Sequence, residues 1–177
     1  MTTGLISVAG CTPALSALQS DGAFTLKIAS ANMLRKVFST QTKSTVEYYR
    51  LLETMCSQLH DSHTGINVPN ELFLETYSRP PLDTRHVDGK VLVARVLDPR
   101  LAKDGIRPGL EIVSVDRVPV QRYAQERVAP YHSWSTPQGY LVGTYEFYLL
   151  CGPGRTPVEI EFLDERGRTF TRTVGRS

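Results

Sequence analysis

Three neighbouring residues, Asp61, Ser62 and His63, are the residue types of a hydrolytic triad. A triad needs a nucleophile, a base and an orienting acid in one line, whereas adjacent positions at the end of a helix point in different directions. We therefore do not expect these three residues to form a self-contained triad. The plainer interpretation is that His60 and His63 lie in the last turn of a helix and interact with its C-terminal dipole.

The sequence does not predict a metal site, a disulfide framework or a cofactor. His60 and His63 are three positions apart, not four as in the His-Glu-x-x-His motif, and no carboxylate is spaced to complete a site. Cys11, Cys56 and Cys151 are widely separated and contain no Cys-x-x-Cys pair.

The composition is that of a globular protein without a strong electrostatic field. The chain has 177 residues, 41% of them hydrophobic, with 20 Lys and Arg against 18 Asp and Glu. This length suits one domain plus an accessory segment, and a net charge of +2 gives no reason to expect a nucleic-acid partner. No run approaches the roughly 18 apolar residues of a membrane span.

The first 20 residues carry no charged side chain, and residues 8–11 (VAGC) are similar to a lipoprotein cleavage box. No Lys or Arg precedes the apolar stretch, which is shorter than a signal normally requires. Residues 1–22 are accordingly expected to be a leader or disordered, and a signal, a tag and a native leader all stay open.

Residues 23–79 have helical patterning. The first helical face is formed by Leu26, Ala29, Met33, Leu34, Val37 and Phe38. A second helix is predicted to begin with a capping box of Ser44 and Glu47, and to end near Gly65. Its apolar face consists of Tyr48, Leu51, Leu52, Met55 and Leu59. Together these patterns predict a helical hairpin.

Residues 80–177 have the patterning of short strands. Residues 82–87 and 90–97 flank Asp88-Gly89, the pair favoured in a two-residue hairpin turn. Further strands are predicted at 110–115, 158–163 and 169–174, with a short helix at 99–103. A longer helix begins at Thr136-Pro137 and ends before Gly152. The predicted fold is α+β: a helical hairpin followed by a partly open β-barrel with one longer and one short helix.

Two segments resemble a known family. Residues 101–116 (LAKDGIRPGLEIVSVD) resemble the short-helix, turn and strand segment of bacterial, circularly permuted PDZ-like domains. Arg117 stands where those domains have Gly, so we expect a looser turn there. Residues 51–64 (LLETMCSQLHDSHT) are similar to a segment of the tricorn core and carboxy-terminal processing serine peptidases. In that family a helical part precedes a PDZ-like domain, and the protease core follows.

The resemblance implies roles for particular residues. His63 would be the general base of the complete enzyme, and Ser62 would help to orient a distant Glu. A PDZ-like domain binds an extended peptide by strand addition, here between residues 82–87 and the helix at 137–150. The residues expected to line that groove are Arg79, Leu82, Thr84, His86, Leu141 and Tyr145.

The expected carboxylate-binding loop, residues 77–81, is unusual because Pro80 and Pro81 supply no N–H donors. Arg79 could compensate with its positive charge, although loop prolines also serve as ordinary rigid connectors. The nearby loop 131–136 contains Trp134, which could mark a binding surface; we expect its ring to be buried over the core instead.

Two functions follow from these observations. In the first, the chain is the non-nucleophile portion of a serine peptidase whose partner is a polypeptide substrate or a C-terminal peptide. The isolated chain is then expected to be inactive, because the nucleophile lies in the missing protease core. The second is a stand-alone PDZ-like adaptor without catalysis. The resemblance favours a secreted, periplasmic or cell-envelope location.

Overall fold

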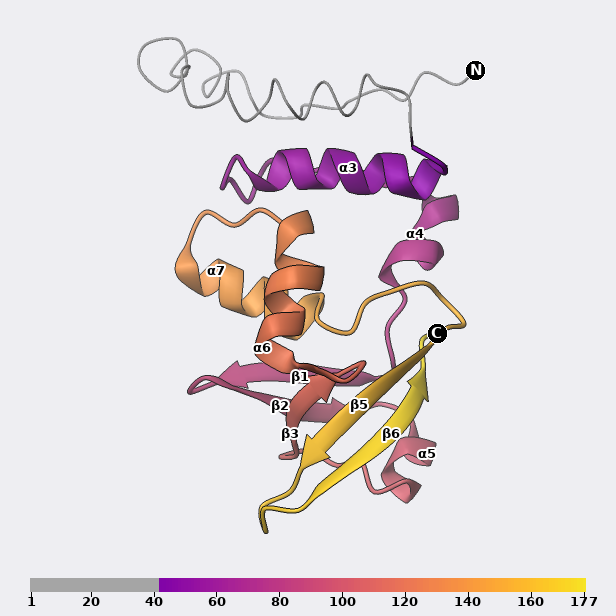
Figure 1. Cartoon of the computed structure of the whole chain (residues 1–177), viewed down its shortest axis with the longest axis vertical. Coiled ribbons are helices and arrows are strands. Elements are labelled where there is room, and N and C mark those ends of the chain that lie inside the picture. Colours follow the sequence, from indigo (N-terminus) through magenta and orange to yellow (C-terminus); the bar gives the residue numbers. More distant parts are fainter. Residues whose placement is uncertain (1–41) are drawn as a thin grey trace.

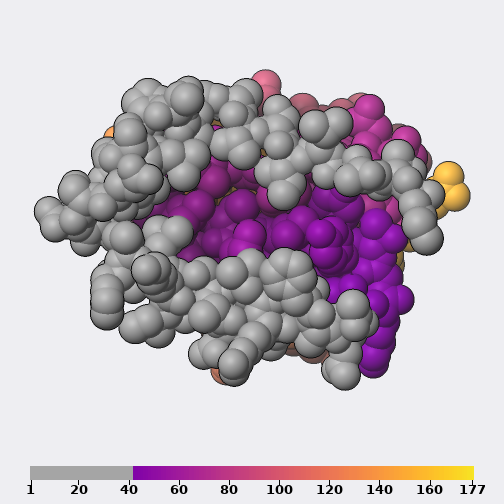
Figure 2. Space-filling view, turned by 90° about the horizontal axis from the view of Figure 1, so that it is seen from above, coloured from indigo at the N-terminus to yellow at the C-terminus, as the bar shows by residue number. Residues whose placement is uncertain are grey.

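The computed structural model describes residues 42–177. The helix expected at 26–38 and the residues before it lie outside this part of the chain. Helices α3 (Thr45–Ser57) and α4 (Asn70–Tyr77) come first, and a six-stranded sheet with further helices follows (Figure 1). Seen from above, α3 lies across the top of the molecule (Figure 2). The boundary near residue 80 remains a prediction.

Helix α3 begins where the sequence predicts. The Glu47 backbone N–H donates to Ser44 Oγ at 3.1 Å, which is the expected N-cap bond. The second bond of the capping box is shifted by one residue: the Glu47 carboxylate accepts from the backbone N–H of Lys43 at 2.6 Å and not from that of Ser44. The predicted end at Gly65 is wrong: α3 ends at Ser57, and His60 adopts the left-handed conformation with a φ of 50°.

The strands form one antiparallel sheet. Its order is β1 (Leu82–Val87), β2 (Lys90–Val96), β3 (Glu111–Val115), β5 (Pro157–Leu163) and β6 (Thr169–Gly175), with β4 (Val118–Pro119) paired to β3. Asp88 and Gly89 join β1 to β2 with φ values of 48° and 79°, as a two-residue hairpin turn requires. The turn from β3 to β4 is equally tight, contrary to expectation, because Arg117 itself adopts a φ of 64°.

C-terminal to β1, the chain forms more helices than the two that were expected. Helix α5 (Pro99–Lys103) was predicted. A helix that the sequence did not indicate consists of α6 (Val120–Tyr123), the π-helical η1 (Ala124–Val128) and the short η2 (Ala129–Tyr131). The predicted longer helix is α7 (Pro137–Leu141), capped by the Thr136 hydroxyl, and it continues as the π-helical η3 (Val142–Phe147).

The core lies between the sheet and the helices above it (Figure 1). On β5 the apolar side chains alternate inward, as the period of two predicts. They pack with residues of the neighbouring strands, turns and helices. The largest fully buried side chains of this cluster are Val91, Val93, Ile106, Leu110, Ile112, Val115, Leu149, Val158, Ile160 and Phe162. The expected α+β class is confirmed.

The two ends of the sheet-containing part meet at one corner. The backbone N–H of Ser177 donates to the carbonyl of Arg79 at 3.2 Å, and that of Gly152 donates to the carbonyl of Ser78 at 2.9 Å. The buried Arg176 guanidinium fixes this corner by donating to the carbonyl of Leu150 at 2.9 Å.

Candidate functional site

Residues 61–64 form a tight turn organised by the Asp61 carboxylate. It accepts from the Thr64 hydroxyl at 2.7 Å and from the His63 backbone N–H at 3.1 Å. The Thr64 backbone N–H also donates to the Asp61 carbonyl at 3.1 Å. These bonds, that of the Thr64 hydroxyl first, hold the pKa of Asp61 below its ordinary value. A short acidic side chain that bonds its own backbone favours a turn over a continuing helix.

The turn presents His63 to solvent. Its Nδ1 lies 3.2 Å from Asp61 Oδ1, and its side chain is 91% exposed. Asp61 and His63 can pair because α3 has already ended and the chain turns between them. The alternative that His60 and His63 occupy the last helical turn is wrong for the same reason. An acid on Nδ1 leaves Nε2 to act as a base.

Ser62 does not contact His63, so the three residues do not form a triad. Its hydroxyl lies 2.8 Å from Ser135 Oγ, and its backbone N–H donates to the same atom at 2.8 Å. The backbone N–H of Asp61 donates to Ser133 Oγ at 2.8 Å. The sequence pattern did not indicate a role for Ser133 or Ser135. The polar, aromatic segment before α7 was the only signal for them.

A group of aromatic and charged side chains lies beneath this turn. His132 stacks on Tyr148 with ring centroids 3.7 Å apart, and the Arg50 guanidinium lies over Tyr131. The buried Glu53 accepts from Tyr77 and Arg50. Burial, and then the charge of Arg50, lowers the pKa of His132 to about 3. The imidazole of His132 is thus neutral and is not a suitable proton acceptor near pH 7.

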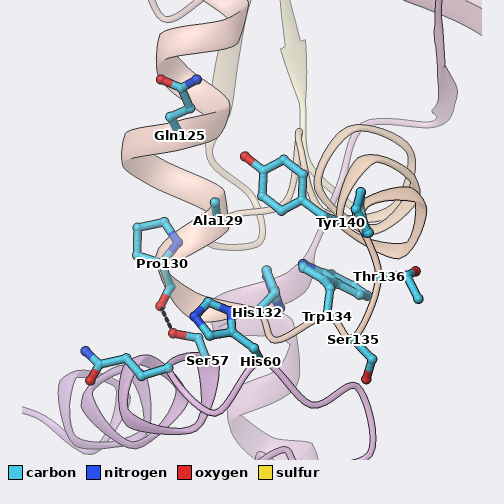
Figure 3. Close-up of a pocket in the computed structure, with 12 residues that line it drawn as sticks. Ser57, His60, Gln125, Ala129, Pro130, His132, Trp134, Ser135, Thr136 and Tyr140 are labelled. Carbon is cyan, nitrogen blue, oxygen red and sulfur yellow. Dashed lines mark hydrogen bonds between the residues drawn. The ribbon is translucent and has the colours of Figure 1, made fainter. Parts of the chain in front are cut away.

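Trp134 agrees with the expectation of burial, although only in part. The side chain is half-buried, and its ring occupies the space that a Cβ on Gly143 would need. Its Nε1 is buried without a hydrogen-bond partner among the described residues. Trp134 also lines a pocket of about 550 Å3 between the end of α3 and the helices, where Ser57 Oγ donates to the carbonyl of Pro130 at 2.8 Å (Figure 3).

The residues expected to bind peptide lie on two adjacent elements that contact each other. Leu82, Thr84 and His86 are on β1, an edge strand, while Leu141 and Tyr145 are on the α7–η3 helix. Thr84 Oγ1 donates to the carbonyl of Tyr145 at 2.6 Å, and the rings of His86 and Tyr145 stack at 4.8 Å.

This packing fills the space between β1 and the α7–η3 helix with the protein's own side chains. Leu82 and Tyr145 are only 2% and 3% exposed. The His86 backbone N–H, which a peptide could use, donates to Glu146 Oε1 at 3.4 Å. A peptide that used this N–H would have to displace the Glu146 carboxylate. Arg79, the sixth expected residue, pairs with Asp83 at 3.2 Å.

Within residues 42–177, no group of three or more His, Cys, Asp or Glu side chains could hold a metal ion. None of the helices in this range is both long and apolar enough to cross a membrane.

Comparison with known proteins gives structural neighbours only. No protein-family model and no curated protein matches the sequence. Mature CPAF is similar with a TM-score of 0.65 and 19% identity, over 92% of this chain and 30% of the CPAF chain. A serine-to-alanine mutant of CPAF has a TM-score of 0.61 and 19% identity, over 83% and 27% of the two chains.

A PDZ domain of a carboxy-terminal protease from Vibrio cholerae, solved in complex with peptide, has 14% identity and covers 58% of this chain and 95% of that domain. Its TM-score of 0.37 is too low to support an argument. The chain spans less than a third of the CPAF structures. At the level of the fold, this chain is similar to part of CPAF.

Proposed function

We propose that this chain is the non-nucleophile portion of a serine peptidase of the tricorn or carboxy-terminal processing type. In this proposal the PDZ-like domain binds or gates the peptide substrate, and His63 is the general base of the complete enzyme. The observation that supports it best is the pairing of Asp61 Oδ1 with His63 Nδ1 on an imidazole that is 91% exposed. A histidine that serves a nucleophile on another domain has to be oriented and accessible in this way.

The chemistry follows from the geometry of the turn. With Nδ1–H donated to Asp61, Nε2 carries the lone pair and can take the proton of a serine hydroxyl as that oxygen attacks a peptide carbonyl. The imidazolium that forms is stabilised by the Asp61 carboxylate, and Nε2–H later protonates the leaving amine. Ser62, whose hydroxyl lies 2.8 Å from Ser135 Oγ, retains bonding capacity for a carboxylate supplied by the core.

The test is a chimera of this chain with the nucleophile-bearing core of a carboxy-terminal processing peptidase. His63→Ala should lower kcat/KM by a factor of roughly 100 or more, which is the usual contribution of a general base. The matched control is His60→Asn, because His60 is also exposed and Asn tolerates its left-handed backbone. Activity of His63→Ala within threefold of the His60→Asn chimera would contradict the proposal.

The isolated chain should hydrolyse no peptide, since covalent catalysis needs a nucleophile within hydrogen-bond reach of its base and Ser62 does not contact His63. Incubation of the pure chain with casein and a fluorogenic peptide checks this expectation. Turnover that His63→Ala abolishes would place a nucleophile in the chain itself.

A further inference from the structure

The turn at residues 58–64 is fixed to the rest of the molecule at two side chains. Its other hydrogen bonds are local, within residues 56–64. In the described range, the sequence-distant partners of residues 58–64 are Ser133, which accepts from the Asp61 N–H, and Ser135, which bonds both the N–H and the hydroxyl of Ser62. All three distances are 2.8 Å.

The two serines are themselves held by the helix that follows them. Trp134, between them, packs its ring against Gly143 of η3, and Thr136 caps α7 by accepting from the Gly139 N–H at 3.0 Å. Trp134 and Ser135 extend in different directions from this segment (Figure 3). Ser133 and Ser135 therefore face the turn while Trp134 faces the helix, as alternate positions of an extended segment do.

We propose that Ser133 and Ser135 are positioning residues for His63, which they hold through the backbone of Asp61 and Ser62. This inference rests on the proposed role of His63 and extends it. An exposed Asp–His pair has little stabilising energy of its own, because water competes for both groups. The backbone that carries the pair thus has to be held from outside the turn, and the serine hydroxyls are the groups that do so. A catalytic base displaced by about 1 Å loses much of its effect.

Hydrogen exchange of the labelled chain tests this proposal without any catalytic partner. Ser133→Ala should raise the exchange rate of the Asp61 amide roughly tenfold, and Ser135→Ala that of the Ser62 amide, since one hydrogen bond is lost in each case. The His63 ring resonances should shift in both variants. Ser133→Thr and Ser135→Thr keep the hydroxyl and should restore wild-type exchange and ring shifts.

The matched control is Ser57→Ala, which removes the Ser57–Pro130 bond of 2.8 Å between α3 and the same helical layer without touching the turn. It should leave both amides and the His63 ring unchanged. The proposal would be overturned if the exchange rates of the Asp61 and Ser62 amides rose less than twofold in the alanine variants. It would also be overturned if Ser57→Ala raised these rates as much as the alanine variants do. If the alanine variants fail to fold, the threonine variants decide the test. Threonine variants that fold but exchange these amides rapidly would also overturn the proposal.

In the chimera described above, the alanine variants should lower kcat severalfold with little change in KM. The two proposals fail separately. If the exchange results hold but His63→Ala chimeras remain active, the turn is positioned as inferred and His63 is not the base. If His63→Ala is inactive but the exchange rates do not change, His63 is the base and the serines do not position it.

Discussion

His132 is a residue whose environment changes its chemistry. Its ring is stacked on Tyr148, and burial, followed by the charge of Arg50, lowers its pKa from 6.5 to about 3. Between these two values the unfolded chain binds a proton that the native state does not. The stability that His132 contributes is thus complete above about pH 6.5 and is lost progressively as the pH falls toward 3.

Replacing His132 by Phe keeps the stacking and removes the titration. Between pH 7 and pH 5 the wild type should lose roughly 1 to 2 kcal/mol more unfolding free energy than His132→Phe. Urea denaturation at the two pH values measures the difference, with His60→Asn as the control that keeps the wild-type dependence. Equal losses in wild type and His132→Phe would mean that the ring titrates normally.

At the scale of elements, the α7–η3 helix depends on a close approach that only glycine permits. A Cβ on Gly143 would overlap the Trp134 ring. Gly143→Ala should therefore destabilise the fold by roughly 1 to 3 kcal/mol by overpacking, although Ala is the better helix former. Gly65→Ala is the control, because nothing lies within 4 Å of a Cβ there. A thermal melt of Gly143→Ala at or above the wild-type temperature would contradict the close packing.

The beginning of α3 gives a second prediction at this scale. Ser44→Ala removes the bond of 3.1 Å from the Glu47 N–H, and the unfolding free energy should fall by roughly 1 kcal/mol. Thr45→Ala, at the exposed next position, should change stability by less than about 0.5 kcal/mol. Superimposable denaturation curves for Ser44→Ala and Thr45→Ala would show that the cap contributes nothing.

The elements that the sequence predicts correctly have local causes. Ser44, Asp88-Gly89 and Thr136-Pro137 each act on residues within four positions, so their caps and turns can be read directly. The helix from Val120 to Tyr131 was missed because its π-helical and 3-10 turns, and Pro130 near its end, break the regular period. Ser133 and Ser135 were missed because their partners lie more than 70 residues away.

At the scale of the whole molecule, peptide binding has to compete with internal contacts. Pro80 and Pro81 offer no N–H donors, Arg79 pairs with Asp83, and the α7–η3 helix covers β1. A hydrophobic peptide should bind with a Kd of tens of micromolar or weaker, about −6 kcal/mol or less favourable. Amidation of the peptide's C-terminus should weaken binding less than about threefold, because the loop at residues 77–81 has few backbone N–H groups that could bind a carboxylate.

Calorimetric titration with the free-acid and amidated forms of one peptide measures both quantities. A loss of more than tenfold on amidation would reveal a competent carboxylate pocket, and Arg79→Ala would then show whether the guanidinium provides it. The matched variant is Arg85→Ala, which removes a neighbouring exposed guanidinium on β1.

The corner where Ser177 bonds to Arg79 has a mechanical consequence. A single covalent segment, residues 78–81, joins α4 to the sheet-containing part (Figure 1). The orientation of that part against α3 is then set by non-covalent contacts alone: the Ser57–Pro130 bond, the Ser133 and Ser135 bonds, and Arg50 over Tyr131. Loss of those contacts would therefore weaken the docking of α3 without breaking any strand pairing within the sheet.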